Sequence, residues 1–216
     1  MPDTRSDMLL PEHVTIKPSV LYFGTPVVLA TTRSPDGSTN ITPMSSAWAL
    51  SDKVVLGLGM TGQGAQNLQR DSECVLNFPS EVLQPNVERI ARATGRNPVP
   101  EAKARMGYTH VADKFALGGF TPVGSEIVGP PRIAECPLQF EARAVAIHHA
   151  QGDKGSGHLS DLAIVETKVL RIHAHRGIVV SGTNHIDTAR WKPLFYVFRH
   201  YFGPGPDLGR NFRAEA

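Results

Sequence analysis

Glycine and proline interrupt this chain so frequently that long helices are excluded over most of its length. The sequence holds 20 Gly and 17 Pro among 216 residues, and both counts are high for a chain of this size. Between these residues lie short runs rich in β-branched side chains, such as 26–32 and 53–59. Apolar runs bounded by turn residues predict strands. The pattern therefore favours a mainly β fold with short helices over a helical bundle.

The predicted strands follow one another through turns, with few helices between them. The predicted strands are 26–32, 39–50, 53–59, 73–78, 138–149, 162–175 and 177–181, with Pro43 marking a break or bulge and 151–158 forming a hairpin loop. The first three are expected to form an antiparallel meander. Because crossover helices are scarce, the pattern disfavours a doubly wound parallel sheet. A closed or partly closed antiparallel barrel fits best, since closure removes exposed sheet edges.

Three short helices are expected in the middle of the chain. The first begins near Gly64, the second covers 86–95 with Asn86 as its cap and Gly95 at its end, and the third covers 101–106.

The chain is expected to form one domain with two appendages. The predicted organisation is an N-terminal arm at 1–17, a domain at 18–200 with a helical insertion at about 86–114, and a C-terminal tail at 201–216. Aromatic residues gather in 191–212, where they are expected to cover either the chain's own core or a partner subunit.

Composition and charge argue against several classes of protein. A net charge of +2 and a pI of about 8.6 are too mild to indicate nucleic-acid binding. The chain holds no apolar run long enough for a membrane span, and its start does not resemble a secretory signal. We therefore expect a cytoplasmic protein. Of the two cysteines, Cys74 is expected in the core, whereas Cys136 could be exposed.

Two segments carry the residue types expected of a ligand site. Small hydroxyl and amide residues surround a proline in 40–46, where a kinked strand would expose backbone polar groups. A glycine-rich loop at 59–64 leads into a predicted helix, an arrangement suited to phosphate. The alternatives are an ordinary β-bulge in the first segment and an ordinary strand-to-helix turn in the second.

Neither a metal site nor a catalytic side chain is predicted. The histidines lack the further ligands that would complete a metal site, and no Ser-His-Asp or activated cysteine arrangement stands out.

The order of these segments resembles the flavin reductase-like family of FMN-binding split β-barrel proteins. The resemblance lies in 24–32, 36–37, 40–46, 67–68, 73–77 and 129–137, and covers roughly residues 18–200. It implies an antiparallel split barrel that binds FMN, usually as a homodimer. It also implies hydride transfer from NADH or NADPH to flavin, with a flavin-dependent monooxygenase as a possible partner.

The resemblance assigns the cofactor site residue by residue. Strand residues from Thr42 to Ser46 would line the ring and ribityl chain, and residues from Thr61 to Gly64, with Asn67, would hold the phosphate. The predicted flavin-binding residues are Asn40, Thr42, Pro43, Met44, Ser45, Ser46, Thr61, Gly62, Gln63, Gly64 and Asn67. Family members often carry a basic residue and a threonine where this chain has Gly62, Gln63 and Gly64. Phosphate would therefore rely on backbone N–H groups, Thr61 and a distant Arg or Lys.

Other residues are candidates for the substrate side. Lys103, Arg105 and Lys114 could face the phosphates of the nicotinamide nucleotide, and His200 and Tyr201 could reach over the flavin. The alternatives are a solvated helix face for the basic residues and core packing for the aromatic ones. Two other functions stay open: a flavin relay or storage protein with little turnover, and a dimeric barrel that binds no flavin.

Overall fold

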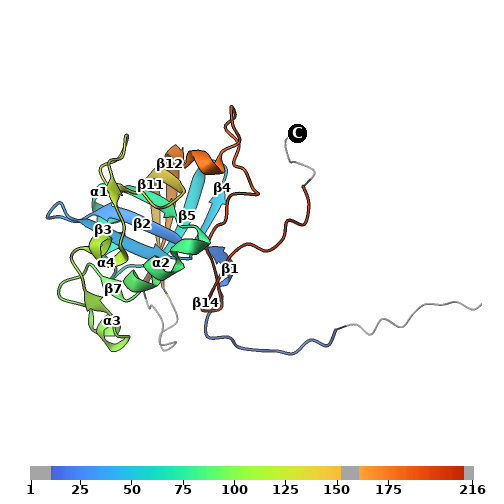
Figure 1. The fold of residues 1–216 in the computed structure, drawn as a ribbon. Helices are drawn as coiled ribbons and strands as arrows, with labels where there is room; N and C mark the ends of the chain where they lie inside the picture. The colour runs from blue at the N-terminus through green and yellow to red at the C-terminus, as the bar shows by residue number, and fades with distance from the viewer. Residues whose placement is uncertain (1–10, 152–160, 212–216) are drawn as a thin grey trace, which may run out of the picture.

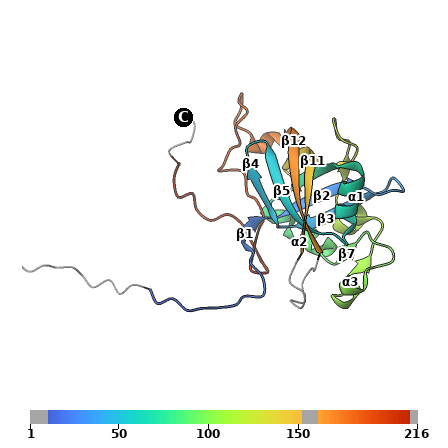
Figure 2. The ribbon, with the colours of Figure 1, turned by 180° about the vertical axis from the view of Figure 1, so that it is seen from behind.

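A curled sheet of seven antiparallel strands forms the centre of the molecule (Figures 1 and 2). The computed structural model describes residues 11–151 and 161–211. In sheet order the strands are β3 (Thr39–Met44), β2 (Val28–Arg33), β6 (Glu73–Phe78), β11 (Leu138–Gln151), β12 (Asp161–Ala174), β5 (Lys53–Gly59) and β4 (Ala47–Leu50). The predicted mainly β, antiparallel architecture is confirmed.

The two edges of this sheet are neighbours in the chain. β3 and β4 are the edge strands, and Ser45 and Ser46 alone connect them. Three Cα–Cα steps span at most about 11 Å, so the connection holds the two edges close together at one end. The sheet therefore curls into a barrel that is tied at Ser45–Ser46 without a ladder between its edges.

Burial on both faces of β2 explains its continuous apolar run. Val28 and Ala30 point into the barrel, where they pack in the first core cluster with Leu56 and Leu76. Leu29 faces outward and joins the second core cluster. A strand covered on both sides carries an unbroken apolar sequence. This outer cluster joins the barrel to the helices that follow.

Short helices lie outside the barrel (Figure 1); several pack on it, whereas the one at 101–105 buries no residue and stands away from it. They are α1 (Gln63–Asp71), η1 (Glu81–Leu83), α2 (Gln84–Ile90), α3 (Glu101–Arg105), α4 (Lys114–Gly118) and η2 (Arg176–Ile178). The helices expected near Gly64 and at 101–106 are confirmed. Val87 and Ile90 of α2 are buried with Phe115 of α4 in the outer cluster.

The predicted boundaries of the second helix are wrong. α2 begins at Gln84, with Pro85 in its first turn, a position that proline favours. Asn86 is not its cap, because the Asn86 side chain donates to the Gly118 carbonyl at 2.7 Å. Gly95 does not end it either: the helix stops at Ile90, and a short strand follows before Gly95.

Small sheets complete the fold. β1 (Phe23–Pro26) pairs with β13 (Phe195–Val197), which pairs with β14 (His200–Phe202). The remaining strands are β7 (Ala93–Thr94), β8 (Thr109–His110), β9 (Pro122–Val123) and β10 (Arg132–Ile133). β14 thus crosses the boundary expected between the domain and the tail at residue 200. Before β1, the described part of the arm runs away from the barrel (Figures 1 and 2).

Several predicted strands differ from the observed ones. The predicted strand 39–50 is two strands, β3 and β4, and the break falls at Ser45–Ser46 rather than at Pro43. The meander is wrong, because β3 and β4 sit at opposite edges of the sheet. Pro43 is tolerated within β3 because an edge strand leaves one side unpaired.

Two predicted segments in the second half of the chain are not seen as predicted. The strand predicted at 177–181 is wrong: η2 occupies its start, and only an isolated bridge joins Val179 to Ile186. Most of the hairpin loop predicted at 151–158 lies outside the described residues.

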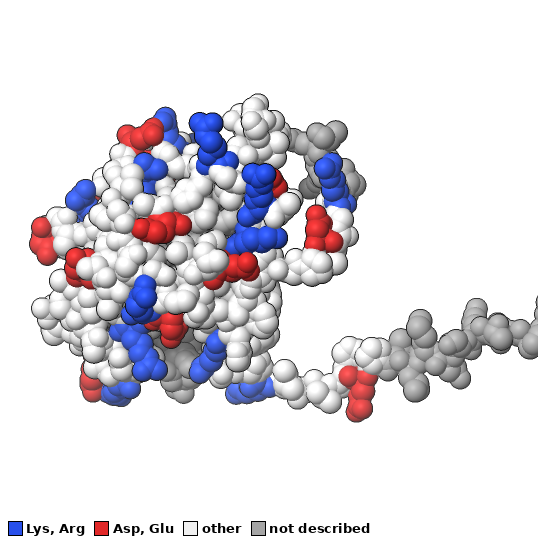
Figure 3. Space-filling view, in the orientation of Figure 1, with Lys and Arg blue, Asp and Glu red and all other residues white. Residues whose placement is uncertain are grey.

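Charges of both signs are interspersed on the face of the molecule in Figure 3. Within the described ranges, no helix is long and apolar enough to cross a membrane.

Candidate functional site

The first turn of α1 lies directly against β3. A Cβ atom placed on Gly64 would be 2.4 Å from Oγ1 of Thr42, which is closer than real side chains approach. Gly62 is the N-cap, and it offers no side-chain cap hydrogen bond. The first N–H groups of a helix have no partner within the helix. The glycines therefore bring these donors, and the positive end of the helix dipole, close to β3.

A buried hydrogen-bond network lies beside this helix start. The side-chain nitrogen of Asn40 donates to Thr42 Oγ1 at 2.9 Å. Lys114, the first residue of α4, donates to Asn40 Oδ1 at 3.0 Å and to the Ile41 carbonyl at 2.8 Å. Lys114 is only 3% exposed. Two predicted flavin-binding residues and one predicted substrate-side residue thus meet at one point.

Two more cations lie near the start of α1. Lys103 of α3 extends toward Gly62, since a Cβ on Gly62 would be 3.5 Å from its Nζ. Arg96 donates to the Gln66 side chain on α1, and its Nε is buried without a partner in the described part of the chain. Arg96, Lys103 and Lys114, together with the first turn of α1, are called the cationic cradle below.

Burial weakens the charge of this cradle in the free protein. It lowers the pKa of Lys114 to about 7, and the nearby positive charge of Lys103 acts in the same direction. The pKa of Lys103 is also lowered, first by burial and then by Arg96. An anion placed among these groups would oppose both effects, because it would stabilise their charged forms.

Sequence reasoning found the members of the cradle only in part. Arg96 was not predicted as a site residue, and its only signal was that it is a basic residue within the helical insertion at about 86–114. Arg105, predicted together with Lys103, is not part of the cradle, because it pairs with Glu101 and is well exposed. The partners of Lys114 are 73 and 74 positions away in the chain, so no local pattern could show them.

The other predicted residues of β3 lead to the junction between the barrel's edges. Pro43 and Met44 end the strand, and Ser45 is buried in the connection that follows. Ser46 Oγ lies 3.0 Å from the hydroxyl of Tyr22. A Cβ on Gly57 would be only 2.9 Å from the Cβ of Ser46, so the connection sits tightly on β5.

The predicted phosphate residues do not all face the same way. Thr61 is exposed, whereas Asn67 is buried and uses its side chain internally. Its nitrogen donates to Thr32 Oγ1 at 3.0 Å, and its oxygen accepts from Gln63 at 2.8 Å. In this arrangement Asn67 ties α1 to β2 and accepts from Gln63, so its side-chain amide is occupied within the protein.

Three of the tyrosines form a cluster of ring contacts, called the tyrosine cluster below. Tyr22 and Tyr196 stack edge to face at 5.4 Å, as do Tyr196 and Tyr201. Tyr201 donates to Glu88 at 3.1 Å. Its pKa is raised well above the usual value, first by burial and then by the negative charge of Glu88. Of the two predicted substrate-side residues in the tail, Tyr201 is thus separated from Ser46 by two rings, and His200 is exposed.

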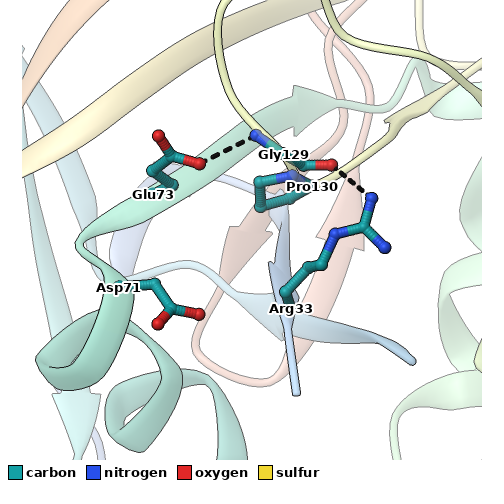
Figure 4. A pocket seen from close by; sticks show the side chains of 5 residues that line it. All are labelled: Arg33, Asp71, Glu73, Gly129 and Pro130. Atoms are coloured by element: carbon teal, nitrogen blue, oxygen red, sulfur yellow. Dashed lines mark hydrogen bonds between the residues drawn. The ribbon is translucent and has the colours of Figure 1, made fainter. Parts of the chain in front are cut away.

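A separate polar hollow of about 230 Å³ is lined by Arg33, Asp71, Glu73, Gly129 and Pro130 (Figure 4). Arg33 donates to the Gly129 carbonyl at 2.7 Å, and the Gly129 N–H donates to Glu73 at 2.8 Å. These groups use their hydrogen bonds to fasten the 124–131 segment to the barrel. The polar groups that line the hollow are therefore explained by their structural role, without a ligand.

The two cysteines and two of the histidines take part in packing or in hydrogen bonds within the protein. Cys74 is buried in the barrel, as predicted, and burial raises its pKa to about 12. Cys136, which could have been exposed, is fully buried in the outer cluster. Of the histidines considered as metal ligands, His173 lies 2.7 Å from Glu141, and His175 contacts the Ala134 carbonyl at 2.8 Å.

Comparison with known proteins adds an independent finding. The family model described as "Flavin reductase like domain" matches residues 20–205. A protein of Bacillus subtilis (strain 168), named "Uncharacterized protein YdfE", is 44% identical over 200 residues, which are 93% of each chain.

Solved structures show the same fold at low sequence identity. Flavoredoxin of Desulfovibrio vulgaris (Miyazaki F) has a TM-score of 0.73 at 18% identity, covering 95% of this chain and 99% of its own. Nitrilotriacetate monooxygenase component B from Bacillus cereus has a TM-score of 0.71 at 16% identity, covering 93% and 100%. The expected split β-barrel is thereby confirmed.

Proposed function

Because the chain belongs to the flavin reductase-like domain family, we propose that it binds FMN at the junction of the barrel's edges and is reduced by NADH or NADPH. The proposed reaction is hydride transfer from the nicotinamide to the flavin. Family membership supports an oxidoreductase activity. The choice of FMN, the nicotinamide donor and the site residues are proposals.

The cationic cradle is the observation that carries this proposal. Three basic side chains and a helix start with free N–H donors converge on one place. The residues present therefore fit a phosphate group: the helix start has no side-chain cap, Lys103 extends to Gly62, and the Nε of Arg96 is buried without a partner among the described residues. Phosphate at a helix start surrounded by cations is a favourable arrangement. We assign the FMN phosphate to the cradle.

The flavin ring is assigned to the other end of β3. From Thr42 to Ser46 the strand runs from the cradle to the junction with β4. Edge-strand backbone groups on the unpaired side can donate to and accept from a heterocycle. Ser45, Ser46 and the Tyr22 hydroxyl are the nearby side-chain donors, and they would orient the ring.

The assigned residues would bind and orient the flavin, which is the contribution that hydride transfer between two cofactors requires of a protein. Bound FMN would supply the hydride-accepting ring, so no acid–base pair from the protein is required. The protein's contribution is to hold two planar groups in contact and to exclude water. His200, exposed beside the tyrosine cluster, is the proposed contact for the incoming nucleotide.

The reduced flavin needs an acceptor, and we propose a flavin-dependent monooxygenase as the partner. The name of the Bacillus cereus structure, a monooxygenase component B, supports this choice by analogy only. The alternative is a flavin relay or storage protein, as the name flavoredoxin suggests for the other structure.

Visible spectroscopy of the purified protein tests the proposal. After loading with FMN and desalting, the protein is expected to keep flavin absorbance, and anaerobic NADH or NADPH is expected to bleach it. Retained flavin that neither nucleotide reduces would favour the relay or storage protein. If no flavin is retained, a turnover assay with free FMN distinguishes substrate-like binding from a barrel that binds no flavin.

Variants locate the site in the same experiment. Ser45→Ala and Lys103→Met are expected to weaken FMN retention, because each removes an assigned donor. Lys168→Met is the matched control, since Lys168 is half-exposed on β12 and pairs only loosely with Asp52 at 3.8 Å. Equal retention by all three variants would contradict the site assignment.

A further inference from the structure

The ammonium group of Lys114 is buried against neutral acceptors. Its two hydrogen bonds go to an amide oxygen, Asn40 Oδ1, and to a carbonyl oxygen, that of Ile41. Neither carries a negative charge. Buried charged groups in proteins are ordinarily paired with an opposite charge, because desolvation is costly. Lys114 departs from this rule.

The surrounding charged groups do not compensate Lys114. Asp113, its neighbour in the chain, is exposed and accepts from the Ala116 N–H. On α2, which packs against α4, Glu88 accepts from Tyr201 and Arg89 donates to the Gly118 carbonyl. On the side of α3, Lys103 adds a like charge. Among residues 11–151 and 161–211, no carboxylate forms an ion pair with Lys114.

A buried amine without a counter-charge can avoid the desolvation penalty in two ways. It can release its proton, or it can bind an anion. Burial and Lys103 lower the pKa of Lys114 to about 7, so the free protein at pH 8 holds it mostly neutral. An anion in the cradle would reverse this, because it favours the protonated form.

We propose that Lys114 makes the site selective for phosphorylated over unphosphorylated flavin, by taking up a proton from solvent when the phosphate docks in the cradle. This inference rests on the proposed function. Lys114 contacts Asn40 and Ile41 at the start of β3, beside the cradle and away from the end of the strand assigned to the ring. A flavin without phosphate, such as riboflavin, brings no anion and leaves Lys114 neutral.

The proposal gives a definite pH dependence for binding. Above pH 7, FMN must bind together with a proton, so its affinity falls as pH rises. Below about pH 6 the phosphate monoester itself begins to protonate, and the affinity falls again. FMN affinity should therefore peak between these values, whereas riboflavin affinity should stay flat across the range.

Isothermal titration calorimetry measures both parts of the proposal. FMN and riboflavin are titrated at pH 8 into the full chain, in phosphate-free buffers that differ in ionisation enthalpy. With a pKa of about 7, Lys114 should take up close to one proton per FMN and none per riboflavin. Its removal in Lys114→Met should lower FMN affinity on the order of 100-fold and leave riboflavin affinity unchanged.

Two further variants distinguish charge from structure. Lys114→Arg keeps a positive charge that does not titrate, so FMN affinity should stay within about tenfold while proton uptake disappears. Lys168→Met should change neither quantity. Thermal melting checks that each variant folds. If Lys114→Arg does not fold, two measurements still test the proposal: the proton uptake of the natural protein, and the ratio of FMN to riboflavin affinity in Lys114→Met.

The outcomes separate this inference from the proposed function. If FMN binds with no proton uptake at pH 8, or if Lys114→Met keeps the natural ratio of FMN to riboflavin affinity, the inference is overturned and the flavin site stands. If the protein binds neither flavin, the proposed function fails and the inference fails with it.

Discussion

At the scale of single residues, the start of α1 depends on the absence of side chains. Gly64 lies where any Cβ would strike Thr42, and Gly95 lies where a Cβ would be 2.5 Å from Asn40 Oδ1. Both contacts are with polar atoms of the buried network around Lys114. Glycine is required at these places by close approach, because neither has a positive φ.

Gly64→Ala is expected to destabilise the protein by about 1–3 kcal/mol, because the new methyl group overpacks the contact with Thr42. The same substitution at an exposed helical glycine would instead raise the free energy of unfolding by about 0.5–1 kcal/mol. Urea denaturation measures the difference. Gly177→Ala is the control, since nothing lies within 4 Å of its Cβ position. Adding Thr42→Ala should restore stability to Gly64→Ala, and a stable single variant would contradict the explanation.

The charge of Lys114 gives a second prediction, for the flavin-free protein. Its pKa is lowered from 10.5 to about 7 on folding, so between these values the unfolded chain binds more protons. Stability from this group therefore rises as pH increases from 7 toward 10. The free energy of unfolding of the natural protein, minus that of Lys114→Met, should increase between pH 7 and pH 9. A difference that is flat or falls with pH would show that Lys114 is not buried as an amine.

At the scale of elements, one carboxylate fastens a long connection to the barrel. Glu141 on β11 is fully buried and accepts from the backbone N–H groups of Glu126, Ile127 and Val128 at 2.6 to 3.0 Å. His173 Nε2 on β12 lies 2.7 Å from the same carboxylate. Desolvation acts to raise its pKa, but these hydrogen bonds outweigh it and lower the pKa to about 2.

Glu141→Gln is expected to cost about 2–4 kcal/mol, because a neutral amide cannot accept all of these bonds. Hydrogen exchange should report faster exchange at the N–H groups of Ile127 and Val128. The pKa of Glu141 is lowered on folding, so its contribution is complete above about pH 4.5 and is lost as pH falls toward 2. The stability difference between the natural protein and Glu141→Gln should shrink over that range. Unchanged protection of the two amides would rule out this role.

At the scale of the whole molecule, one edge of the barrel exposes apolar side chains. Trp48 and Leu50 on the edge strand β4 are 56% and 65% exposed. Residues two apart on a strand share a face. β1 contacts β4, and Phe23 of β1 is also exposed. Exposed apolar edges are ordinarily covered, and we propose that a second copy of the chain covers this one.

Sedimentation equilibrium at micromolar concentration tests this proposal. The natural protein is expected to have the mass of a dimer. Trp48→Asp combined with Leu50→Lys should shift it to the monomer, because two charges would be buried at the interface. Lys168→Met should stay dimeric. A natural protein that is monomeric under these conditions would overturn the proposed dimer.

The sequence alone determined the elements whose signals are local. The strands at 53–59 and 73–78 and the two long strands were recognisable, because an apolar run and its turns lie within a few residues. The order of these segments was also enough to indicate the family. Local signals failed where contacts with distant residues set the structure. Asn86 resembles a helix cap, but its side chain donates to the carbonyl of Gly118, which is far along the chain.

The tertiary structure alone decided the pairing of strands and the composition of the site. Nothing near Ser45–Ser46 shows that the strands on either side lie at opposite sheet edges, because pairing depends on partners far along the chain. Lys114 reads as an ordinary basic residue in sequence. Only folding removes its water and leaves it against Asn40 and Ile41, with no carboxylate of the described residues paired to it. Desolvation is a property of the packed molecule and not of the residue.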